Sequence, residues 1–208
     1  MINFINKNKL LATTAICAIS ICANTVKAEE ISISEILNNS TTKSPNISWE
    51  EVTTAGENTI QIGDKYFKYT WTNKDAAWGK YTERQENTLS GDVVGDFIGV
   101  EYETSSDAYG GAVYNGGSIE SITGNFINNS INHTGNNCVY GGVIYNASTV
   151  DNIKGDFINN SIDTSSENQN RGGSIYNSGT ISSIIGNFIG NSINSTGLTS
   201  TTITAIFC

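Results

Sequence analysis

The hydrophobic and polar positions in the second half of the chain repeat with a 31-residue period. Three segments superimpose without a gap, starting at Gly110, Gly141 and Gly172. They read GGAVYNGGSIESITGNFINNSI, GGVIYNASTVDNIKGDFINNSI and GGSIYNSGTISSIIGNFIGNSI. A weaker copy precedes them, since Gly95-Asp96-Phe97-Ile98 matches the run that begins at Gly124 with a slightly shorter offset. Self-similarity at a fixed period indicates a repeat architecture in which neighbouring units stack on one another.

The residues inside each unit favour strands over helices. The recurrent stretches are short, β-branched or aromatic, and bounded by Gly, Asn or Ser, which is typical of strands separated by turns. Helical repeats need runs of about ten or more good helix formers, and these units contain little Ala, Leu or Glu. We therefore predict an all-β fold, a right-handed parallel β-helix over residues 87–197, with successive coils stacked about 4.8 Å apart.

Alternation along the strands assigns the inner and outer faces of this predicted β-helix. Val113 and Asn115 share the inner face, while Tyr114 points outward. Apolar residues at equivalent positions are expected to form the core. These columns are Val113/Ile144/Ile175, Ile119/Val150/Ile181, Ile122/Ile153/Ile184, Phe126/Phe157/Phe188 and Ile131/Ile162/Ile193. A structural ladder of inward amides is predicted at Asn115, Asn146 and Asn177, because Asn both donates and accepts hydrogen bonds. Residues 132–140 and 163–171 are predicted to be polar loops.

Residues 1–28 are predicted to be a cleavable signal peptide. Lys7 and Lys9 precede an apolar run from Leu10 to Ala23, and the small-residue pattern Val26-Lys27-Ala28 follows. The apolar run is too short for a permanent membrane span, and no direct membrane anchor is expected. The mature chain is thus predicted to be exported to the periplasm, the cell surface or the extracellular space.

Residues 29–86 are not repetitive and contain all three tryptophans. Two strands around Gly63-Asp64 are expected to form a hairpin that packs over the first coil through four residues. These are Ile60, Ile62, Phe67 and Trp71. We interpret the region as a β-rich cap of the open coil edge, with residues 29–45 loosely ordered. A separate Trp-rich ligand module is the less favoured alternative, because so short a segment rarely sustains its own core. Residues 198–208 are expected to be a short tail without a further unit, because Ile203-Thr204 stand where the next glycine pair would begin.

Charge and cysteine content narrow the function classes. The chain has 20 Asp and Glu against 11 Lys and Arg, a net charge of −9, which disfavours sequence-independent nucleic-acid binding. Removal of residues 1–28 would take away three lysines and no acid, leaving −12. It would also leave only Cys138 and Cys208, which do not make a disulfide scaffold. Export would permit a bridge between them, but two unpaired thiols are the favoured interpretation.

The paired motifs resemble those of a known family. The tetrapeptides GGAV, GGVI and GGSI, with FINN, FINN and FIGN, resemble the GGA[ILV] and FxxN repeats of chlamydial polymorphic outer membrane proteins and similar autotransporter passenger domains. The resemblance covers residues 87–197 and departs from the pattern at Val100, Val143 and Ser174. It implies a β-helical passenger at the bacterial surface with a role in adhesion. It also implies a C-terminal barrel, for which 198–208 is too short, so an isolated or truncated passenger is expected.

Catalysis is not expected from the residues. Glu120 and Asp151 occupy equivalent positions one coil apart, within the spacing of a glycosidase pair, but Ser182 takes that position in the third unit. We interpret them as solvated turn carboxylates, and His133 as a loop residue without ligand partners. No catalytic residue, metal site or cofactor is predicted. A β-helical carbohydrate-binding or polysaccharide-cleaving protein remains the alternative to an adhesive or structural role.

A binding surface is predicted on the outer face. Tyr114, Tyr145 and Tyr176 are expected to form one outward column, and Tyr109, Tyr140 and Arg171 a second one. A row of aromatic faces with polar rims is suited to a host glycan or a partner protein at a surface. The alternative is that these rings only cover the flank of the β-helix and stack for stability.

Overall fold

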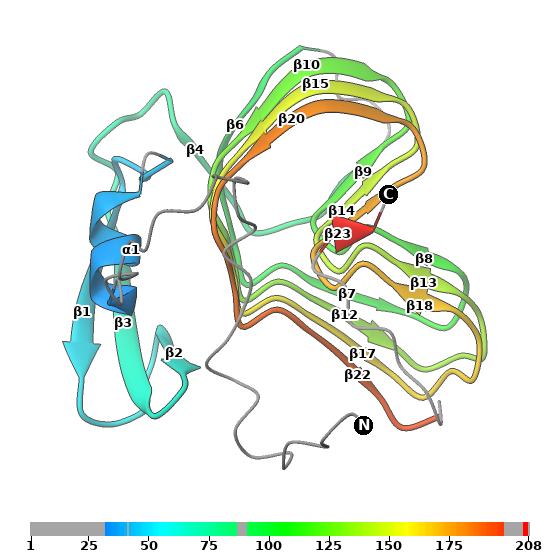
Figure 1. Cartoon of the computed structure of the whole chain (residues 1–208), viewed down its shortest axis with the longest axis horizontal. Helices are drawn as coiled ribbons and strands as arrows, with labels where there is room; N and C mark the ends of the chain where they lie inside the picture. Colours follow the sequence, from blue (N-terminus) through cyan, green and yellow to red (C-terminus); the bar gives the residue numbers. More distant parts are fainter. Residues whose placement is uncertain (1–31, 41, 87–90, 198–205, 208) are drawn as a thin grey trace, which may run out of the picture.

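The structure is a computed structural model that describes residues 32–40, 42–86, 91–197 and 206–207. The predicted signal peptide lies outside these residues. The described chain is mostly β, with a single helix α1 (Ile33–Asn39). It consists of a parallel β-solenoid and a small antiparallel sheet at the N-terminal side, which stand next to one another (Figure 1).

The solenoid confirms the parallel repeat architecture. Strands at equivalent positions pair in parallel in the register of the sequence repeat, as in Ile122↔Ile153 and Ile153↔Ile184. The lead-in and first coil comprise β4 (Gly79–Tyr81), β5 (Gln85–Glu86), β6 (Val93–Ile98), β7 (Glu101–Thr104) and β8 (Ala108–Tyr109). The second coil comprises β9 (Val113–Asn115), β10 (Ser118–Thr123), β11 (Phe126–Ile127), β12 (Ser130–His133) and β13 (Val139–Tyr140).

Two further coils follow the same pattern. The third comprises β14 (Ile144–Asn146), β15 (Thr149–Lys154), β16 (Phe157–Ile158), β17 (Ser161–Thr164) and β18 (Asn170–Arg171). The fourth comprises β19 (Ile175–Asn177), β20 (Thr180–Ile185), β21 (Phe188–Ile189) and β22 (Ser192–Ser195). A last strand, β23 (Ile206–Phe207), pairs with β19 in the register of the repeat. The prediction of no further unit was therefore wrong for these two residues, whose partial repeat lacks the glycine pair.

The shorter offset of the weak first copy has a local cause. Phe97 pairs with Phe126, and Tyr109 pairs with Tyr140, so the offset changes between these two places in the coil. The connection between β7 and β8 is two residues shorter than the connection between β12 and β13. The strands stay in register because the two missing residues fall in a connection and not in a strand.

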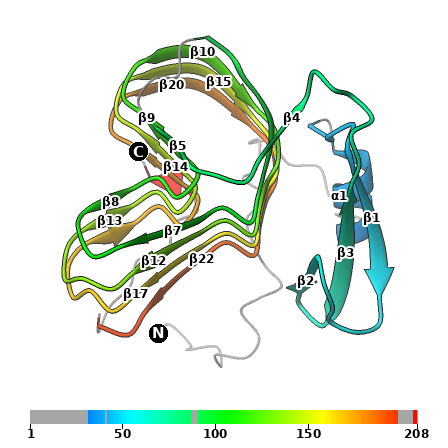
Figure 2. The ribbon, with the colours of Figure 1, turned by 180° about the vertical axis from the view of Figure 1, so that it is seen from behind.

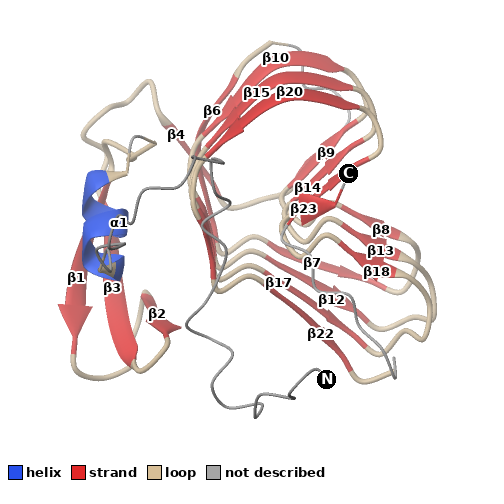
Figure 3. Cartoon of the chain, viewed as in Figure 1, coloured by secondary structure: helices blue, strands red, loops and turns tan. Residues whose placement is uncertain are grey.

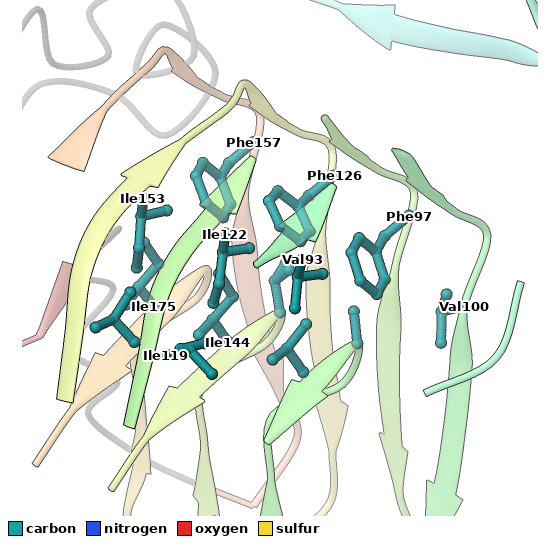
Figure 4. Close-up of a cluster of buried hydrophobic side chains, with 14 residues drawn as sticks. Val93, Phe97, Val100, Ile119, Ile122, Phe126, Ile144, Ile153, Phe157 and Ile175 are labelled. Carbon is teal, nitrogen blue, oxygen red and sulfur yellow. The ribbon is translucent and has the colours of Figure 1, made fainter. Parts of the chain in front are cut away.

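The predicted apolar columns fill the interior of the solenoid. Phe97, Phe126, Phe157 and Phe188 form one continuous stack, with successive ring centroids 5.0, 4.6 and 4.7 Å apart and nearly parallel planes. Figure 4 shows three of these rings beside the Val and Ile columns. The predicted inner face is confirmed at the first strand of each unit, where Val113 is buried and Tyr114 is only partly buried.

Two asparagine ladders run through the interior, and the sequence analysis identified one of them. In the predicted ladder, Asn115 donates to Asn146 and Asn146 donates to Asn177, each over 2.7 Å. The second ladder joins the last residue of each FxxN motif. Its amides are Asn129, Asn160 and Asn191, linked over 2.9 and 2.8 Å. The recurrence of Asn three positions after each Phe was the signal for this ladder.

The N-terminal sheet lies on the flank of the solenoid, which corrects the prediction that it packs over the first coil. Its strands β1 (Ile47–Val52), β3 (Lys65–Trp71) and β2 (Thr59–Ile62) are antiparallel, and β2 and β3 form the predicted hairpin. The sheet packs on an outward column of four isoleucines, one from each coil. These residues are Ile98, Ile127, Ile158 and Ile189. Figure 3 shows the sheet and α1 beside the coils.

Helix α1 corrects the expectation that residues 29–45 are loosely ordered. Ser32 is its N-cap, and the Ser32 hydroxyl accepts a hydrogen bond from the Glu35 backbone N–H while the Glu35 carboxylate accepts one from the Ser32 N–H. This reciprocal pair satisfies two backbone donors at the start of a helix. Leu37 then fixes the helix by packing into the same hydrophobic cluster as the sheet. The Ser-x-x-Glu spacing was readable in the sequence.

A polar column ties the flanking sheet to the solenoid. The residue after the repeated glycine before each Phe alternates between Asp and Asn, in the order Asp96, Asn125, Asp156, Asn187. Each Asn donates to the Asp of the coil before it, as Asn125 does to Asp96 over 3.3 Å and Asn187 to Asp156 over 2.9 Å. The alternation separates carboxylates that would otherwise repel one another at the coil spacing.

The carboxylates of this column also accept hydrogen bonds from side chains of the N-terminal unit. Asp96 is fully buried and accepts from the Ser44 hydroxyl over 2.6 Å and from the Trp71 indole N–H over 3.1 Å. Asp156 accepts from the Thr42 hydroxyl over 3.1 Å. Because charge-assisted hydrogen bonds are stronger than neutral ones, these contacts specify where the sheet docks.

The N-terminal end of the solenoid is covered by residues 79–86. Strand β4 pairs with β6 and β5 pairs with β9, and the Tyr81 ring stacks on Phe97 with centroids 4.4 Å apart. The Arg84 guanidinium donates to the carbonyl oxygens of Tyr109 and Gly110 and lies over the Tyr102 ring. Burial lowers the pKa of Arg84 below its ordinary value. Figure 2 shows this segment crossing the end of the first coil.

Candidate functional site

The tyrosines singled out from the sequence come together at one corner of the solenoid. Tyr109 and Tyr140 lie on β8 and β13, just before the glycine pairs, and the other three lie on β9, β14 and β19, just after them. Those three are Tyr114, Tyr145 and Tyr176. The first glycine of each pair has a positive φ of 68° to 71°, a conformation that favours glycine. All five rings are half-buried on the outer face.

The corner is concave on its outer side. Side chains that leave a convex corner diverge, yet Tyr109 meets Tyr145 across the turn with ring centroids 4.9 Å apart, and Tyr140 meets Tyr176 at 4.8 Å. The two sheets must therefore bend toward each other on the solvent side. Figure 1 shows the coils turning inward between β8 and β9. We call this cluster of five tyrosines the tyrosine corner.

Within each column the rings stack along the solenoid axis. Tyr114 and Tyr145 lie 5.5 Å apart, Tyr145 and Tyr176 5.4 Å apart, and Tyr109 and Tyr140 5.8 Å apart, all with interplanar angles of 20° or less. These distances are within the range of favourable offset stacking. The tyrosine corner is thus one continuous aromatic surface built from strands of four successive coils. Arg171 takes the third position of the Tyr109/Tyr140 column in register.

Polar side chains along the rim form hydrogen bonds with three of the phenol groups. The Tyr140 hydroxyl donates to Gln169 over 3.2 Å, and the Ser178 hydroxyl donates to the Tyr145 oxygen over 3.2 Å. The Tyr109 hydroxyl donates to Asp107 over 3.4 Å. These rim residues were not predicted from the sequence, although Asp107, Cys138 and Gln169 occupy equivalent positions, one repeat period apart. Cys138 is a free thiol among the described residues.

Burial and neighbouring charge disfavour ionisation of two of these phenols. Desolvation raises the pKa of Tyr109, and the carboxylate of Asp107 adds to the effect. Desolvation also raises the pKa of Tyr140, with Cys138 acting in the same direction and the positive charge of Arg171 in the opposite one. Tyr109 and Tyr140 therefore keep neutral hydroxyl groups well above neutral pH.

These pKa shifts predict a loss of stability in alkali. Because both phenols have a higher pKa in the folded chain than the ordinary value near 10 of an unfolded one, their stabilising contribution is complete below about pH 10 and is lost as the pH rises further. We expect ultraviolet titration of the 9 tyrosines to show a late phase that becomes smaller in Tyr109→Phe/Tyr140→Phe. The remainder belongs to Tyr69 of β3, whose pKa is also raised by burial. A single transition at the ordinary pKa would contradict the assignment.

The carboxylates that suggested a catalytic pair lie elsewhere. Glu120 and Asp151 are exposed residues within β10 and β15, so their assignment to turns was wrong. Both side chains are exposed on the outer face of the sheet that contains β10 and β15, which Figure 1 shows apart from the turn between β8 and β9. They are placed to interact with water.

His133 also differs from its predicted place in a loop. It is the last residue of β12 and is buried, with Nε2 3.0 Å from the Ser106 carbonyl oxygen and Nδ1 3.2 Å from the Thr164 hydroxyl. Because a carbonyl oxygen can only accept, Nε2 donates to Ser106, and in the neutral imidazole Nδ1 accepts from the Thr164 hydroxyl. The stretches 132–140 and 163–171 thus contain strand ends and buried polar contacts, so they are not freely variable loops.

The described residues contain neither a cluster of metal-ligating side chains nor a membrane-spanning helix. Within residues 32–40, 42–86, 91–197 and 206–207, no three His, Cys, Asp or Glu side chains gather as metal ligands would. In the same part of the chain, no helix has the length and apolar character needed to cross a membrane.

The fold and this surface together define the class of the protein as a parallel β-solenoid with a laterally docked antiparallel sheet and an aromatic concave corner. Comparison of the chain with family models, with curated proteins and with solved structures found no match.

Proposed function

We propose that the chain is an exported, non-enzymatic β-solenoid protein that acts in adhesion by binding a glycan at its tyrosine corner. The observation that carries the proposal is the continuous contact among five tyrosine rings from four successive coils, with three rings in the longer column. Three positions at the coil spacing of about 4.8 Å give an aromatic strip roughly 10 Å long. This length suits a short stretch of an extended sugar chain, whose ring faces stack on aromatic side chains while its hydroxyl groups reach the polar rim.

The repeat motifs support the adhesive part of the proposal by resemblance. The GGA[ILV] and FxxN patterns are like those of polymorphic outer membrane proteins and autotransporter passengers, and the predicted signal peptide agrees with surface display. In this chain both motifs have structural roles. The first glycine of each pair makes the concave turn, and the last Asn of FxxN makes the second inner ladder. The motifs therefore support the tyrosine corner without taking part in binding themselves.

The polysaccharide-cleaving alternative has less support. A glycosidase pair needs one carboxyl group in an environment that keeps it protonated, whereas Glu120 and Asp151 are both exposed. Glu120→Gln/Asp151→Asn should leave glycan retention unchanged. A polysaccharide-cleaving activity that this change abolishes would overturn the non-enzymatic proposal.

Glycan-array binding tests the proposed site directly. Tyr114→Ser/Tyr145→Ser removes two adjacent rings of one column, and we expect at least a tenfold loss of the glycan signal, or about 1.4 kcal/mol. Tyr114→Phe/Tyr145→Phe keeps the rings stacked and separates loss of hydroxyl groups from loss of folding. Tyr66→Ser, which changes a half-buried tyrosine of β3, is the matched control. Retention that is equal in the wild type and the Ser variant, with both folded, would refute the site.

A further inference from the structure

The C-terminal end of the solenoid differs from the rest of its surface. Strands β20, β21 and β22 are the terminal strands of their sheets among the described residues. Core residues that are fully buried in the middle coils become partly exposed there. These residues are Ile181, Ile184, Phe188 and Ile189. Ile185 is the exposed large hydrophobic side chain of the described chain, at 45%. We call the edge formed by β20, β21 and β22 the end face.

Backbone donors at the end face point away from the solenoid. In the coils before it, the N–H groups of Phe126 and Phe157 donate to carbonyl oxygens of the next coil, at Asp156 and Asn187. The N–H of Phe188 has the same place in its strand, so it is directed out of the end face. The same holds for Gly186 and Gly190, which are equivalent to Gly155 and Asn159 of the third coil. The N–H of Gly155 donates to Ile185 and the N–H of Asn159 to Ile189, so the N–H groups of Gly186 and Gly190 are also directed out of the end face. Such an edge is a template for another strand.

The end face also lacks charge. Residues 172–197 contain no Asp, Glu, Lys, Arg or His. Four charged residues of the third coil, in β15, in β17 and in the turn before β16, have uncharged equivalents in the fourth coil. The pairs are Asp151/Ser182, Lys154/Ile185, Asp156/Asn187 and Asp163/Asn194. Natural edge strands are protected by charged side chains, Lys above all, and this edge has lost that protection.

The opposite end is built differently. There, β4 and β5 cover the edges of β6 and β9. The other edge strands of the first coil are β7, which carries exposed Glu101 and Glu103, and the two-residue β8. A head-to-tail contact would have to displace a paired segment and bury carboxylates. A chain of net charge −9 repels its copies through most of its surface, so an uncharged patch is where two copies can approach. A contact between identical patches closes into a dimer and does not propagate.

We propose that two copies of this chain associate through their end faces, as a two-fold dimer in which β20, β21 and β22 of one copy lie against the same strands of the other. The contact covers the partly exposed core residues of the fourth coil and supplies acceptors for its outward N–H groups. It does not involve the tyrosine corner, so it is independent of the proposed glycan binding.

Sedimentation velocity of the full chain tests the proposal, with concentrations of about 1 to 100 μM because dimerisation follows mass action. We expect a dimer in this range. Ser182→Lys/Asn194→Lys adds two charges to the end face, each above an acid of the third coil, Asp151 or Asp163, so folding should be retained. Like charges then meet across the two-fold axis, and the dissociation constant should rise at least about tenfold.

The matched control puts the same charges two coils away. Ser118→Lys/Asn132→Lys alters outer positions of β10 and β12 and should leave the dimer intact. A wild-type chain that stays monomeric throughout the range overturns the proposal, as does open-ended growth into fibres. A monomer that dimerises only after removal of residues 198–208 also overturns it, since the chain itself would then cover the end face.

Discussion

Replacing Asn160 by Ala should lower the free energy of unfolding by about 3 to 5 kcal/mol, since at least two buried groups lose their partners, and each such loss costs about 1 to 3 kcal/mol. Asn160 is fully buried, and its amide donates to the Phe126 carbonyl oxygen and to Asn191 while its oxygen accepts from the Asn129 N–H. Urea denaturation followed by far-ultraviolet circular dichroism measures the loss.

The matched control for this prediction is Asn152→Ala. Asn152 belongs to the same coil but lies on the outer face of β15, where substitutions usually change stability by less than about 0.5 kcal/mol. Tryptophan fluorescence gives a second probe, because Trp49, Trp71 and Trp78 all belong to the N-terminal part of the chain. In a repeat stack each coil is stabilised by its direct neighbours. We therefore expect circular dichroism and tryptophan fluorescence to give different denaturation midpoints in Asn160→Ala. Equal stability of the two variants would show that the FxxN ladder does not support the coil stack.

Phe126→Ala should cost a similar amount, about 3 to 5 kcal/mol, because it leaves a cavity in a fully packed interior. The Phe126 ring is completely buried and stacks on Phe97 and Phe157 at 5.0 and 4.6 Å. The backbone cannot close the cavity, because the coil spacing is set by parallel strand pairing on both sides. Thermal unfolding followed by circular dichroism is the measurement.

Phe188→Ala makes the corresponding change in the fourth coil. That ring stacks on Phe157 alone and is partly exposed, so its truncation should cost about half as much, since less apolar surface leaves water on folding. If both variants lost the same stability in the monomeric protein, the end of the stack would be as well covered as its middle. If dimer formation protects Phe188, the difference between the two variants should shrink as concentration rises.

The stacking register was predictable because identical residues recur at one spacing. A parallel stack brings each residue next to its copy, and a column of Phe or of Ile buries itself only if equivalent positions of successive units are paired. Alternation within Val113-Tyr114-Asn115 then assigned inside and outside. The same logic gave the Asn115 ladder and could have given the Asn129 ladder as well.

The docking of the N-terminal sheet was not predictable in this way. Residues 32–86 have no internal copy to align, and their apolar residues are compatible with either an end or a flank of the solenoid. The outward isoleucine column that includes Ile127 and Ile158 is repetitive, but a repeat does not say which segment covers it. The contacts of Asp96 with Ser44 and Trp71 cross 52 and 25 positions of sequence.

The candidate site, too, was predictable from the sequence only in part. The two tyrosine columns followed from the period, because each ring has a copy one coil away. The period did not predict that the two columns form one surface, because this depends on the direction in which the chain turns at Gly110 and Gly141. A convex turn would have separated Tyr109 from Tyr145, whereas the observed concave turn brings them within 4.9 Å.

By itself, the sequence determined that the chain forms a parallel stack of coils, which residues fill its interior and how its amide ladders repeat, because a periodic pattern can be satisfied only by periodic contacts. The tertiary structure decided where the non-repetitive sheet docks, which end of the stack has strand edges without a partner among the described residues, and where the tyrosines meet. These features depend on contacts between unlike segments, and no local pattern or period specifies such contacts.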